Sequence, residues 1–592
     1  MFGMVAPDVT TVVTMSLPEQ FEVWAPFAHD VRLLVDDAEH PMSPDPTRSG
    51  WWVLAPEIAA PRDGQRYAYR LFDGTDWTKA LPDPRTRRQP DGVHGASAIV
   101  DSDFPWTDDA WRGRHLRGQV IYELHVGTFT AEGTFEAAAG KLDYLLDLGI
   151  NSIELMPVQP FGGERNWGYD GVDWFAVQES YGGPRGLKKL VDAAHNRGIA
   201  VILDVVYNHF GPDGNYNGMF GPYTTAGSTD WGDVVNLSGP ASDEVRAYIL
   251  DAVRQWLDEF HLDGLRLDAV HAYDDRRAYS IMEEIRRVSD SVAGQTGIPR
   301  TIIGETDQND PRIVNDESVG GYGLSAQWLD DVHHCIHTLV SGERHAYYVD
   351  FGTVDILADT LRHAYRFRNT FSEFRRRTHG RPLDLSQIGP WRMITYTTTH
   401  DQTGNRAAGD RPSQSLTAAQ QLLKAAVVLC SPFTPMLFMG EEYGARTPFP
   451  FFCSHTDEEL NRLTREGRFT EFARLGWNPE DVADPADPAT FYSAKLSWEF
   501  DRDQDEIFEA YQALIGLREQ YDFALDDLRE LEVDNSDAWL TMGYKDVFLA
   551  ANFTDAPVTV PHGGTLVYSF GDPTVTAEET VLEPWGFALV ER

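Results

Sequence analysis

Cysteine is scarce in this chain, whose 592 residues include only Cys335, Cys430 and Cys453. Three scattered thiols provide neither a disulfide framework nor the paired spacing of a cysteine metal site. Small secreted domains are commonly held together by several disulfides, so this composition favours a reducing compartment. We therefore expect a cytoplasmic protein.

Long apolar runs are missing as well. No stretch is long and apolar enough to cross a bilayer as a helix. The N-terminus lacks the basic start and the apolar centre of a signal peptide. We expect residues 1–14 to form a disordered lead, the alternative being an upstream start codon ahead of Met15. We expect no association with a membrane.

Basic residues are few relative to acidic ones. Lys and Arg number 50 against 92 Asp and Glu, which gives a formal net charge of −42. A surface this acidic repels nucleic acid and anionic lipid, so we expect no nucleic-acid partner. Neutral substrates such as oligosaccharides are not disfavoured by it. A saline cytoplasm is an alternative origin of the same charge.

What the sequence does contain is a short apolar strand that ends in a carboxylate, within Asp263–His271. Arg266 and Asp268 share one face of this strand because side chains alternate at period two. A charge at the end of an apolar strand is costly unless it is paired, and Arg266 is the obvious partner. Taken alone, the pattern is equally well explained by a structural ion pair.

Further acidic residues end other apolar strands. Glu305 closes the run from Thr301, Asp401 closes the run from Met393, and Asp204 lies in the run that leads to His209. Acidic residues at the carboxyl ends of successive strands, with helices between, indicate the top of a (β/α)8 TIM barrel, an α/β fold. Two carboxylates that flank a sugar bond would make a glycosidase.

The chain divides into regions of different pattern. Short strands separated by Pro and Gly turns predict a β-sandwich before the barrel and an antiparallel β domain after it. The expected limits are 1–14 for the lead, 15–103 for the N-terminal β-sandwich, 104–118 for a linker, 119–519 for the catalytic barrel with a long loop excursion at about 209–240, and 520–592 for the C-terminal β domain.

Within the barrel region the pattern predicts eight strands and several helices. The expected strands are 120–126, 152–158, 199–204, 263–268, 301–305, 325–331, 393–398 and 434–442, and the expected helices are 135–148, 187–197, 245–260, 277–292 and 416–429.

Four blocks of sequence carry a specific resemblance. DVVYNH at 204–209, GLRLDAVH at 264–271, IIGET at 302–306 and TTTHDQTGN at 397–405 resemble, in this order, the four signature regions of the α-amylase superfamily, glycoside hydrolase family 13. The resemblance implies that Asp268 is the nucleophile, that Glu305 is the acid/base, and that Asp401 holds the sugar hydroxyls and favours ring distortion. The N-terminal sandwich resembles the carbohydrate-binding-like module of glycogen-processing members.

Chemistry adds a requirement on the pKa values of these acids. The general acid must stay protonated near neutral pH, so its pKa must lie above that of the nucleophile. We expect Arg266 to keep Asp268 ionised, and burial beside other carboxylates to raise the pKa of Glu305. Asp204 is expected to orient Arg266 or the strand of Asp268.

The same resemblance implies a set of residues that contact the sugar. Tyr169 takes the position of an aromatic that stacks under the reactive sugar. Many amylases have His two residues before it, where this chain has Trp167, so we expect either a drier wall or simple loop packing there. The further candidates are His209, Arg266, His271 and His400.

Longer blocks at 167–216, 320–352 and 438–460 resemble the maltooligosyltrehalose trehalohydrolases. That resemblance implies cleavage of the α-1,4 bond next to the terminal trehalose of a maltooligosyl trehalose, and functional pairing with a maltooligosyl trehalose synthase. Candidates for the trehalose side of the cleft are Asp331, His333, His334, Gln402 and Asn405. The alternatives are a glycogen branching or debranching enzyme and an inactive glucan-binding barrel.

No cofactor is expected. Calcium is common in amylases, but the sequence contains no dense cluster of Asp and Asn oxygens of the kind calcium requires. The segment Asp213–Asn215 has the composition of a turn. We therefore predict no catalytic metal.

Overall fold

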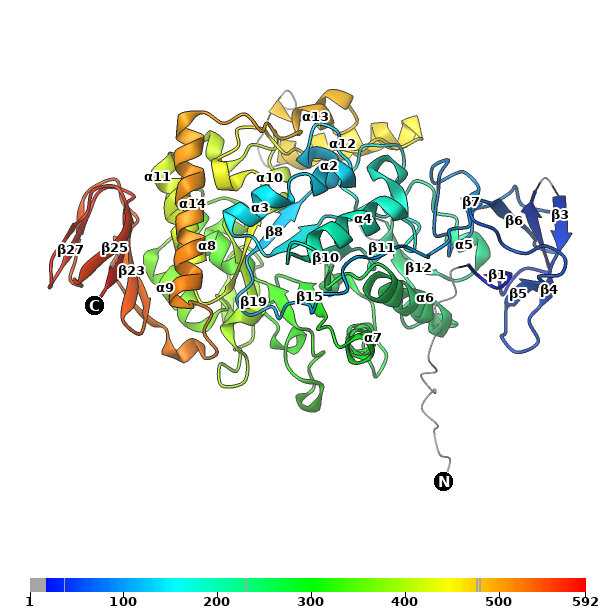
Figure 1. Cartoon of the computed structure of the whole chain (residues 1–592), viewed down its shortest axis with the longest axis horizontal. Helices are drawn as coiled ribbons and strands as arrows, with labels where there is room; N and C mark the ends of the chain where they lie inside the picture. Colours follow the sequence, from blue (N-terminus) through cyan, green and yellow to red (C-terminus); the bar gives the residue numbers. More distant parts are fainter. Residues whose placement is uncertain (1–16, 37, 229–231, 475–477, 479–480) are drawn as a thin grey trace.

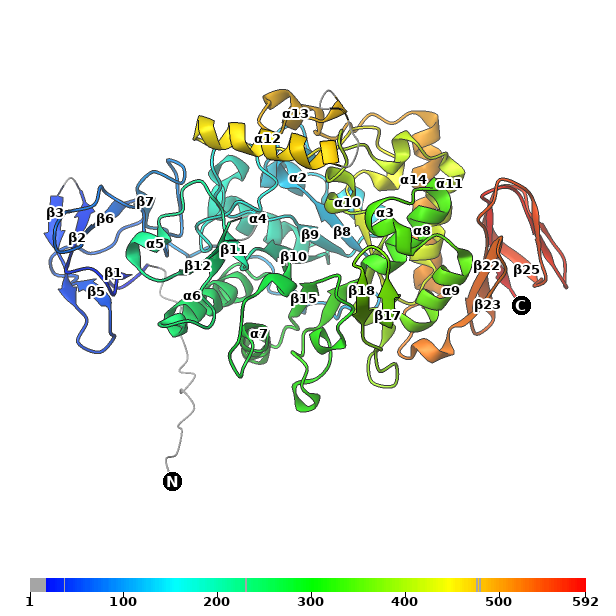
Figure 2. The same cartoon turned by 180° about the vertical axis from the view of Figure 1, so that it is seen from behind.

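The computed structural model describes residues 17–36, 38–228, 232–474, 478 and 481–592. The lead expected at residues 1–14 lies outside the described residues. Figure 1 shows a β region near the start of the chain at one end, a barrel with its helices in the middle, and a second β region at the other end. Figure 2 shows the same order from behind.

The centre of the molecule is a closed barrel of eight parallel strands, in the order β10-β14-β15-β16-β19-β20-β8-β9. The predicted (β/α)8 fold is therefore confirmed. All but one of the strand residues are buried, as expected for strands that helices cover on the outside and side chains fill on the inside. The strands are β8 (Ile121–Leu124), β9 (Ser152–Leu155), β10 (Ala200–Val205), β14 (Gly264–Leu267), β15 (Thr301–Glu305), β16 (Ala326–Trp328), β19 (Met393–Tyr396) and β20 (Thr434–Phe438).

Helices alternate with these strands. Those of the barrel region are α1 (Val126–Phe129), α2 (Phe135–Ala139), α3 (Leu142–Leu148), α4 (Gly183–His195), α6 (Ser242–Arg254), α7 (Ile281–Thr296), α8 (Asp330–Ser341), α9 (Val354–His363), α10 (His400–Gly404), α11 (Ala418–Leu429), α12 (Glu458–Arg474), α13 (Pro488–Ser493) and α14 (Arg502–Tyr521). The single helix expected at 135–148 is divided into α2, which ends at Ala139 before Gly140, and α3, which begins at Leu142. The helix expected at 245–260 corresponds to the last part of α6 together with a π-helical segment that follows it, Gln255–Glu259.

Some predicted strands are too long. The run expected at 325–331 ends at Trp328, and Asp330 and Asp331 form the first turn of α8. Carboxylates are favourable in a first helical turn because they complement the helix dipole, a preference that the strand prediction overlooked. The run expected at 434–442 ends at Phe438, before the left-handed Gly440.

The predicted loop excursion contains its own structure. Its elements are β11 (His209–Phe210), α5 (Asn217–Phe220), β12 (Thr224–Ser228) and β13 (Asp233–Val235), and the three strands pair as an antiparallel sheet. An excursion of this length over a barrel needs internal hydrogen bonds, since its backbone polar groups would otherwise be unpaired where it is buried.

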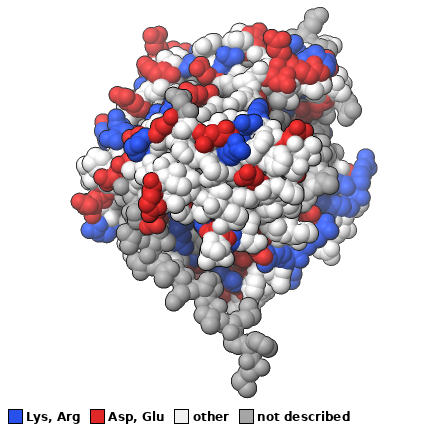
Figure 3. Space-filling view, turned by 90° about the vertical axis from the view of Figure 1, so that its right-hand side faces the viewer, with Lys and Arg blue, Asp and Glu red and all other residues white. Residues whose placement is uncertain are grey.

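Two antiparallel sheets form the N-terminal β region. They are β1 (Phe21–Trp24), β5 (Trp51–Leu54) and β4 (Ser43–Pro44), and β3 (Ala38–Pro41), β2 (Asp30–Val35), β6 (Arg66–Phe72) and β7 (Ser97–Ala98). Trp24 packs against Tyr223 of the excursion, with ring centroids 5.2 Å apart. Figure 3 shows acidic and basic side chains mixed on this end of the molecule, around an area of uncharged residues.

The C-terminal region also contains two antiparallel sheets, ordered β21-β22-β23-β28-β25 and β24-β27-β26. Their strands are β21 (Glu532–Asn535), β22 (Trp539–Tyr544), β23 (Val547–Asn552), β24 (Val558–Val560), β25 (Thr565–Phe570), β26 (Thr574–Val575), β27 (Thr580–Leu582) and β28 (Phe587–Glu591). Arg362 of α9 donates to the carbonyl of Val533, 2.8 Å away, and joins this region to the barrel. The domain limits themselves stay a prediction. Within the described residues, no helix has the length and apolarity to cross a membrane.

Candidate active site

Asp268 directly follows β14 and is held on both carboxylate oxygens. Arg266 donates to Oδ1 at 2.8 Å, and Asn208, which follows β10, donates to Oδ2 at 2.7 Å. The same Asn208 amide also donates to the Asp268 carbonyl at 3.0 Å. The carboxylate therefore has one orientation, and its side chain is 16% exposed.

Glu305 ends β15, the next strand of the barrel. Its Oε2 accepts from the backbone N–H of Ala269 at 2.6 Å and lies 3.5 Å from Nη2 of Arg266. Ala269 has the left-handed φ of 42°, which is unusual for a residue with a side chain and turns its N–H toward Glu305. Burial raises the pKa of Glu305 to about 8, against the opposing effect of Arg266 and with help from Asp268 and Asp401.

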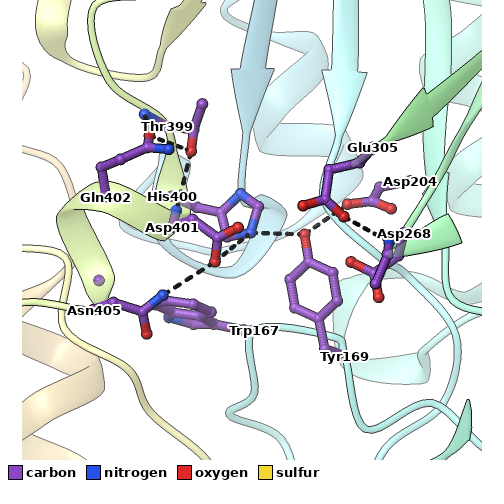
Figure 4. A network of polar contacts seen from close by, with 12 residues as sticks. Trp167, Tyr169, Asp204, Asp268, Glu305, Thr399, His400, Asp401, Gln402 and Asn405 are labelled. Atoms are coloured by element: carbon purple, nitrogen blue, oxygen red, sulfur yellow. Dashed lines mark hydrogen bonds and ion pairs between the residues drawn. The ribbon is translucent and has the colours of Figure 1, made fainter. Parts of the chain in front are cut away.

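Arg266 joins the two strands. It is fully buried, and its Nη1 lies 2.7 Å from Asp204 and 2.8 Å from Asp268. Its guanidinium lies over the ring of Trp328, 4.2 Å from the centroid. Burial raises the pKa of Asp204 to about 6, although Arg266 opposes this. One cation thus lies within 3.5 Å of three carboxylates from neighbouring strands. Figure 4 shows these carboxylates, Asp204, Asp268 and Glu305, close to one another.

Asp401 lies on the short helix α10 rather than at a strand end. Thr399 and Gln402 form a capping box that begins this helix, so the two residues between them are held in its first turn. Glu123 of β8 accepts from both the backbone N–H and the Nδ1 of His400, at 3.1 and 2.5 Å. Burial by itself lowers the pKa of His400, but Glu123 and Asp401 outweigh it and raise the pKa to about 9. His400 is therefore a cation at neutral pH, with Nε2 3.6 Å from Asp401.

Tyr169 connects the two halves of the site. Its hydroxyl donates to Asp204 at 2.6 Å and meets Nε2 of His400 at 2.9 Å, and its ring stacks on His400. Trp167 is buried, donates from Nε1 to the carbonyl of Pro450, and stacks on Phe449. Loop packing accounts for these contacts of Trp167, and its ring also meets His400 edge to face, 5.5 Å between centroids.

The other two predicted histidines are placed differently. His209 is buried on β11, where Nε2 contacts the carbonyl of Tyr169 at 3.0 Å and Nδ1 contacts Asn208. It therefore orders the residues beside Asp268. His271 is exposed on the turn Val270–Ala272 and lines a polar cavity of about 260 Å³ together with Gln308 and Arg312.

The candidates on α8 are engaged with the protein. Asp331 accepts from the Asn309 amide at 2.7 Å and from the Arg366 backbone at 3.0 Å. His333 contacts the carbonyl of Thr397 at 2.7 Å, and His334 stacks on Tyr347. Among the described residues, no hydrogen bond or ion pair joins these three to Asp268, Glu305 or Asp401.

The candidates on α10 have partners close to Asp401. Gln402 accepts from the N–H of Thr399 at 2.8 Å and donates to Asp330 at 3.1 Å. Asn405, directly after α10, donates to Oδ1 of Asp401 at 3.2 Å.

Two residues of the site escaped the sequence-based assignment. Asn208 lies inside the block DVVYNH, so its place in that motif was the available signal. Glu123 lies in a strand that was predicted, and a lone acid in the run from Val120 to Val126 was the only hint of its contact with His400. Their partners are 60 and 277 residues away along the chain, so no local pattern identifies them.

The arrangement supplies the parts of acetal hydrolysis. Asp268 is an oriented carboxylate, Glu305 has a pKa that keeps it protonated at neutral pH, and Asp401 is 41% exposed and free to meet hydroxyls. Within the described part of the chain, no group of three or more His, Cys, Asp or Glu side chains is placed to hold a metal ion.

The comparisons with known proteins agree with this arrangement of the site. A family model described as the alpha amylase catalytic domain matches residues 90–231. The chain is 49% identical over 586 residues to a malto-oligosyltrehalose trehalohydrolase of Mycobacterium tuberculosis (strain CDC 1551 / Oshkosh), covering 97% of this chain and 99% of the relative. A malto-oligosyltrehalose trehalohydrolase of Rhizobium sp. (strain M-11) is 47% identical, with 95% and 96% covered. The crystal structure of a putative alpha amylase from Salmonella typhimurium superposes with a TM-score of 0.87 at 33% identity, with 96% and 97% covered.

Proposed function

This chain belongs to the malto-oligosyltrehalose trehalohydrolases of the α-amylase family, and from that membership we propose how it cleaves its substrate. It is a glycosidase that hydrolyses the α-1,4 bond next to the terminal trehalose of a maltooligosyl trehalose and releases trehalose. The reaction proceeds with retention through a glycosyl ester on Asp268. The observation that carries this proposal is the pair Asp268 and Glu305 on neighbouring strands, both in contact with Arg266.

In the first step Glu305 donates its proton to the glycosidic oxygen. The bond from that oxygen to the anomeric carbon breaks, trehalose leaves, and an Asp268 oxygen bonds to the anomeric carbon. Asn208 and Arg266 each hold one Asp268 oxygen, so the carboxylate meets the sugar in one orientation. Preorganised contacts of this kind lower the barrier because no reorientation is needed during the reaction.

In the second step a water attacks the ester and gives its proton to Glu305. The Asp268–carbon bond breaks, and the shortened maltooligosaccharide leaves with its original anomeric configuration. Asp401 accepts hydrogen bonds from sugar hydroxyls and stabilises the distorted ring. His400 is a cation because of its contact with Glu123. It lies beside Asp401, where it acts as a hydrogen-bond donor.

Other parts of the assignment are predictions. We propose that Tyr169 stacks under the reactive sugar and that His271 donates to a hydroxyl near the cleaved unit. We also propose functional pairing with a synthase that makes maltooligosyl trehalose, because this substrate must be formed before it can be cleaved. The cytoplasmic location stays a prediction.

Proton NMR of the reaction tests the proposal. With maltooligosyl trehalose as substrate, we expect free trehalose and, initially, the α-anomer at the new reducing end. Maltooligosaccharide of equal length serves as the control and should be cleaved much more slowly. New α-1,6 resonances would favour a branching enzyme, binding without turnover would favour an inactive barrel, and an initial β-anomer would exclude retention.

A further inference from the structure

Helix α12 lies outside the barrel, in the segment between β20 and α13. Figure 2 shows it along the top of the molecule, above α10. The sequence analysis predicted no helix or strand at Glu458–Arg474. Most of its charged side chains pair along the helix, as Arg462 does with Glu459 and Glu466.

Arg468 of α12 also reaches beyond the helix, to the end of α10. Its Nη2 donates to the carbonyl of Gly404 at 2.8 Å and to Oδ1 of Asn405 at 3.0 Å, at the C-terminal end of α10. Its Nη1 pairs with Glu471 at 3.1 Å. The side chain is 15% exposed, so most of it is shielded from competing water.

The contact with Asn405 has a consequence for Asp401. Arginine can only donate hydrogen bonds, so it selects the orientation in which the Asn405 carbonyl oxygen faces α12. The Asn405 amide nitrogen then faces the other way and donates to Oδ1 of Asp401 at 3.2 Å (Figure 4). Asp401, which as a carboxylate only accepts, and Arg468, which only donates, therefore favour the same orientation of the Asn405 amide, and Arg468 holds the amide in it.

A second contact connects Arg468 to the aromatic residues Phe451 and Trp167. Its guanidinium lies over Phe451, 5.3 Å from the ring centroid, and Phe451 packs edge to face on Trp167 at 5.2 Å. Trp167 in turn meets His400 edge to face. Arg468 thus contacts Asn405, which binds Asp401, and Phe451, which packs on Trp167.

We propose that Arg468 is a positioning residue that orients Asp401 through Asn405, so that a helix outside the barrel completes the active site. The inference rests on the proposed role of Asp401 in the function above. Small displacements of a group that stabilises the transition state lower the rate strongly while substrate binding is little changed.

A double-mutant cycle with Arg468→Ala and Asn405→Ala tests the proposal. We expect kcat on maltooligosyl trehalose to fall about 10- to 100-fold in each single variant, with KM within about twofold of the wild type. The double variant should be no slower than the slower single variant, because both substitutions break the same relay. Arg462→Ala, on the same helix, is the matched control, because among the described residues Arg462 pairs along the helix, with Glu459 and Glu466, and it should keep the wild-type kcat.

Arg468→Lys controls for the case in which Arg468→Ala lowers kcat by unfolding α12. Lysine keeps the charge and the apolar stem but not the planar guanidinium fork, so we expect the protein to fold and kcat to stay below the wild-type value. A kcat of Arg468→Ala within twofold of the wild type, or effects of the two single variants that multiply in the double variant, would overturn the inference. Asp401→Asn separates the two claims: if it stays active, the proposed function itself is wrong; if it is inactive while Arg468→Ala is normal, only the relay is wrong.

Discussion

At the scale of single residues, Arg266 determines how charge is distributed in the site. A buried cation is costly unless several partners compensate for its lost hydration. Here Asp204, Asp268 and Glu305 surround it, and the ring of Trp328 covers one face. Because one positive charge serves three acids, at least one acid is favoured in its neutral form. Glu305, with its raised pKa, is that acid.

Substitution of the two central acids tests their separate roles. Glu305→Gln should lower kcat/KM by about 10²–10⁴-fold, since it removes proton transfer to the leaving oxygen. Asp268→Asn should lose at least as much, because no ester can form. Circular dichroism should show an unchanged fold in both variants. Asp290→Asn, which changes an exposed acid on α7, is the control, and comparable activity in Asp268→Asn and this control would exclude the nucleophile assignment.

The pKa of Glu305 predicts an alkaline limit of activity. As pH rises through about 8, Glu305 loses the proton that the leaving group needs, so kcat/KM should fall with a midpoint near that value. A pH–rate profile between pH 5 and 10 measures this midpoint. A flat profile up to pH 10 would contradict the assignment of Glu305 as the acid.

The same shift has a consequence for stability. The folded-state pKa of Glu305 lies above its ordinary value, so its contribution to stability is complete below that ordinary value and is lost as pH rises through about 8. Glu305→Gln cannot ionise and avoids this loss. We expect its Tm to exceed that of the wild type by roughly 2 °C at pH 9 and to match it at pH 5. Equal Tm values at both pH values would show that Glu305 is not shifted.

The sequence alone predicted the three acids of the site but not all of their partners. The acids at 268, 305 and 401 stand in blocks whose order along the chain carries the information. Asn208 and Glu123 act through partners far away in sequence, and that contact exists only after the barrel closes. The buried roles of His333 and His334 likewise depend on the face that α8 turns inward.

At the scale of elements, α10 is the piece that the strand pattern could not describe. The run from Met393 was predicted as a strand to Thr398, but β19 ends at Tyr396 and α10 begins at His400. The capping pair Thr399 and Gln402 was visible in the sequence as T-x-x-Q, a signal for a helix start that the strand prediction overrode. Helix α12 was missed because its apolar residues are few and form no clear stripe.

Close packing of α10 against Trp167 gives a test at this scale. A Cβ atom at Gly404 would lie 1.9 Å from Cζ2 of Trp167, so Gly404→Ala must displace either the indole or α10. We expect kcat to fall at least tenfold and the protein to lose roughly 2 kcal/mol of stability. Kinetics and thermal unfolding measure the two effects.

Gly467→Ala on α12 is the matched control for that substitution. Its added Cβ would meet no atom within 4 Å, and alanine favours a helix more than glycine does. It should leave kcat unchanged and stabilise the protein slightly. If the two variants behaved alike, packing at Gly404 would not control the position of α10.

At the scale of the whole molecule, the barrel carries the site and the two β regions lie on opposite sides of it (Figure 1). The closed sheet was predictable because four acids ended four apolar runs with helices between them. The contacts between regions were not, because they join segments such as Trp24 and Tyr223 that share no pattern. The net charge of −42 argued only against nucleic acid and anionic lipid as partners.

The N-terminal contact allows a test that separates stability from catalysis. Trp24 is buried against Tyr223, so Trp24→Ala should destabilise the N-terminal β region by about 3 kcal/mol. Calorimetry should show an earlier unfolding transition, while kcat at 25 °C stays within twofold. Phe27→Ala, at a side chain that is 69% exposed, should leave both unchanged. An unaltered melting curve for Trp24→Ala would show that this contact does not hold the region in place.

The most direct test of the central claim is to trap the ester on Asp268. Glu305→Gln should still be glycosylated by α-maltosyl fluoride, whose leaving group needs no acid, but it should release the sugar slowly because the base for water is gone. Mass spectrometry of the digested protein should find one maltosyl unit on the peptide that contains Asp268. A sugar attached to another residue, or fluoride release with no adduct and a β-anomeric product, would contradict the account.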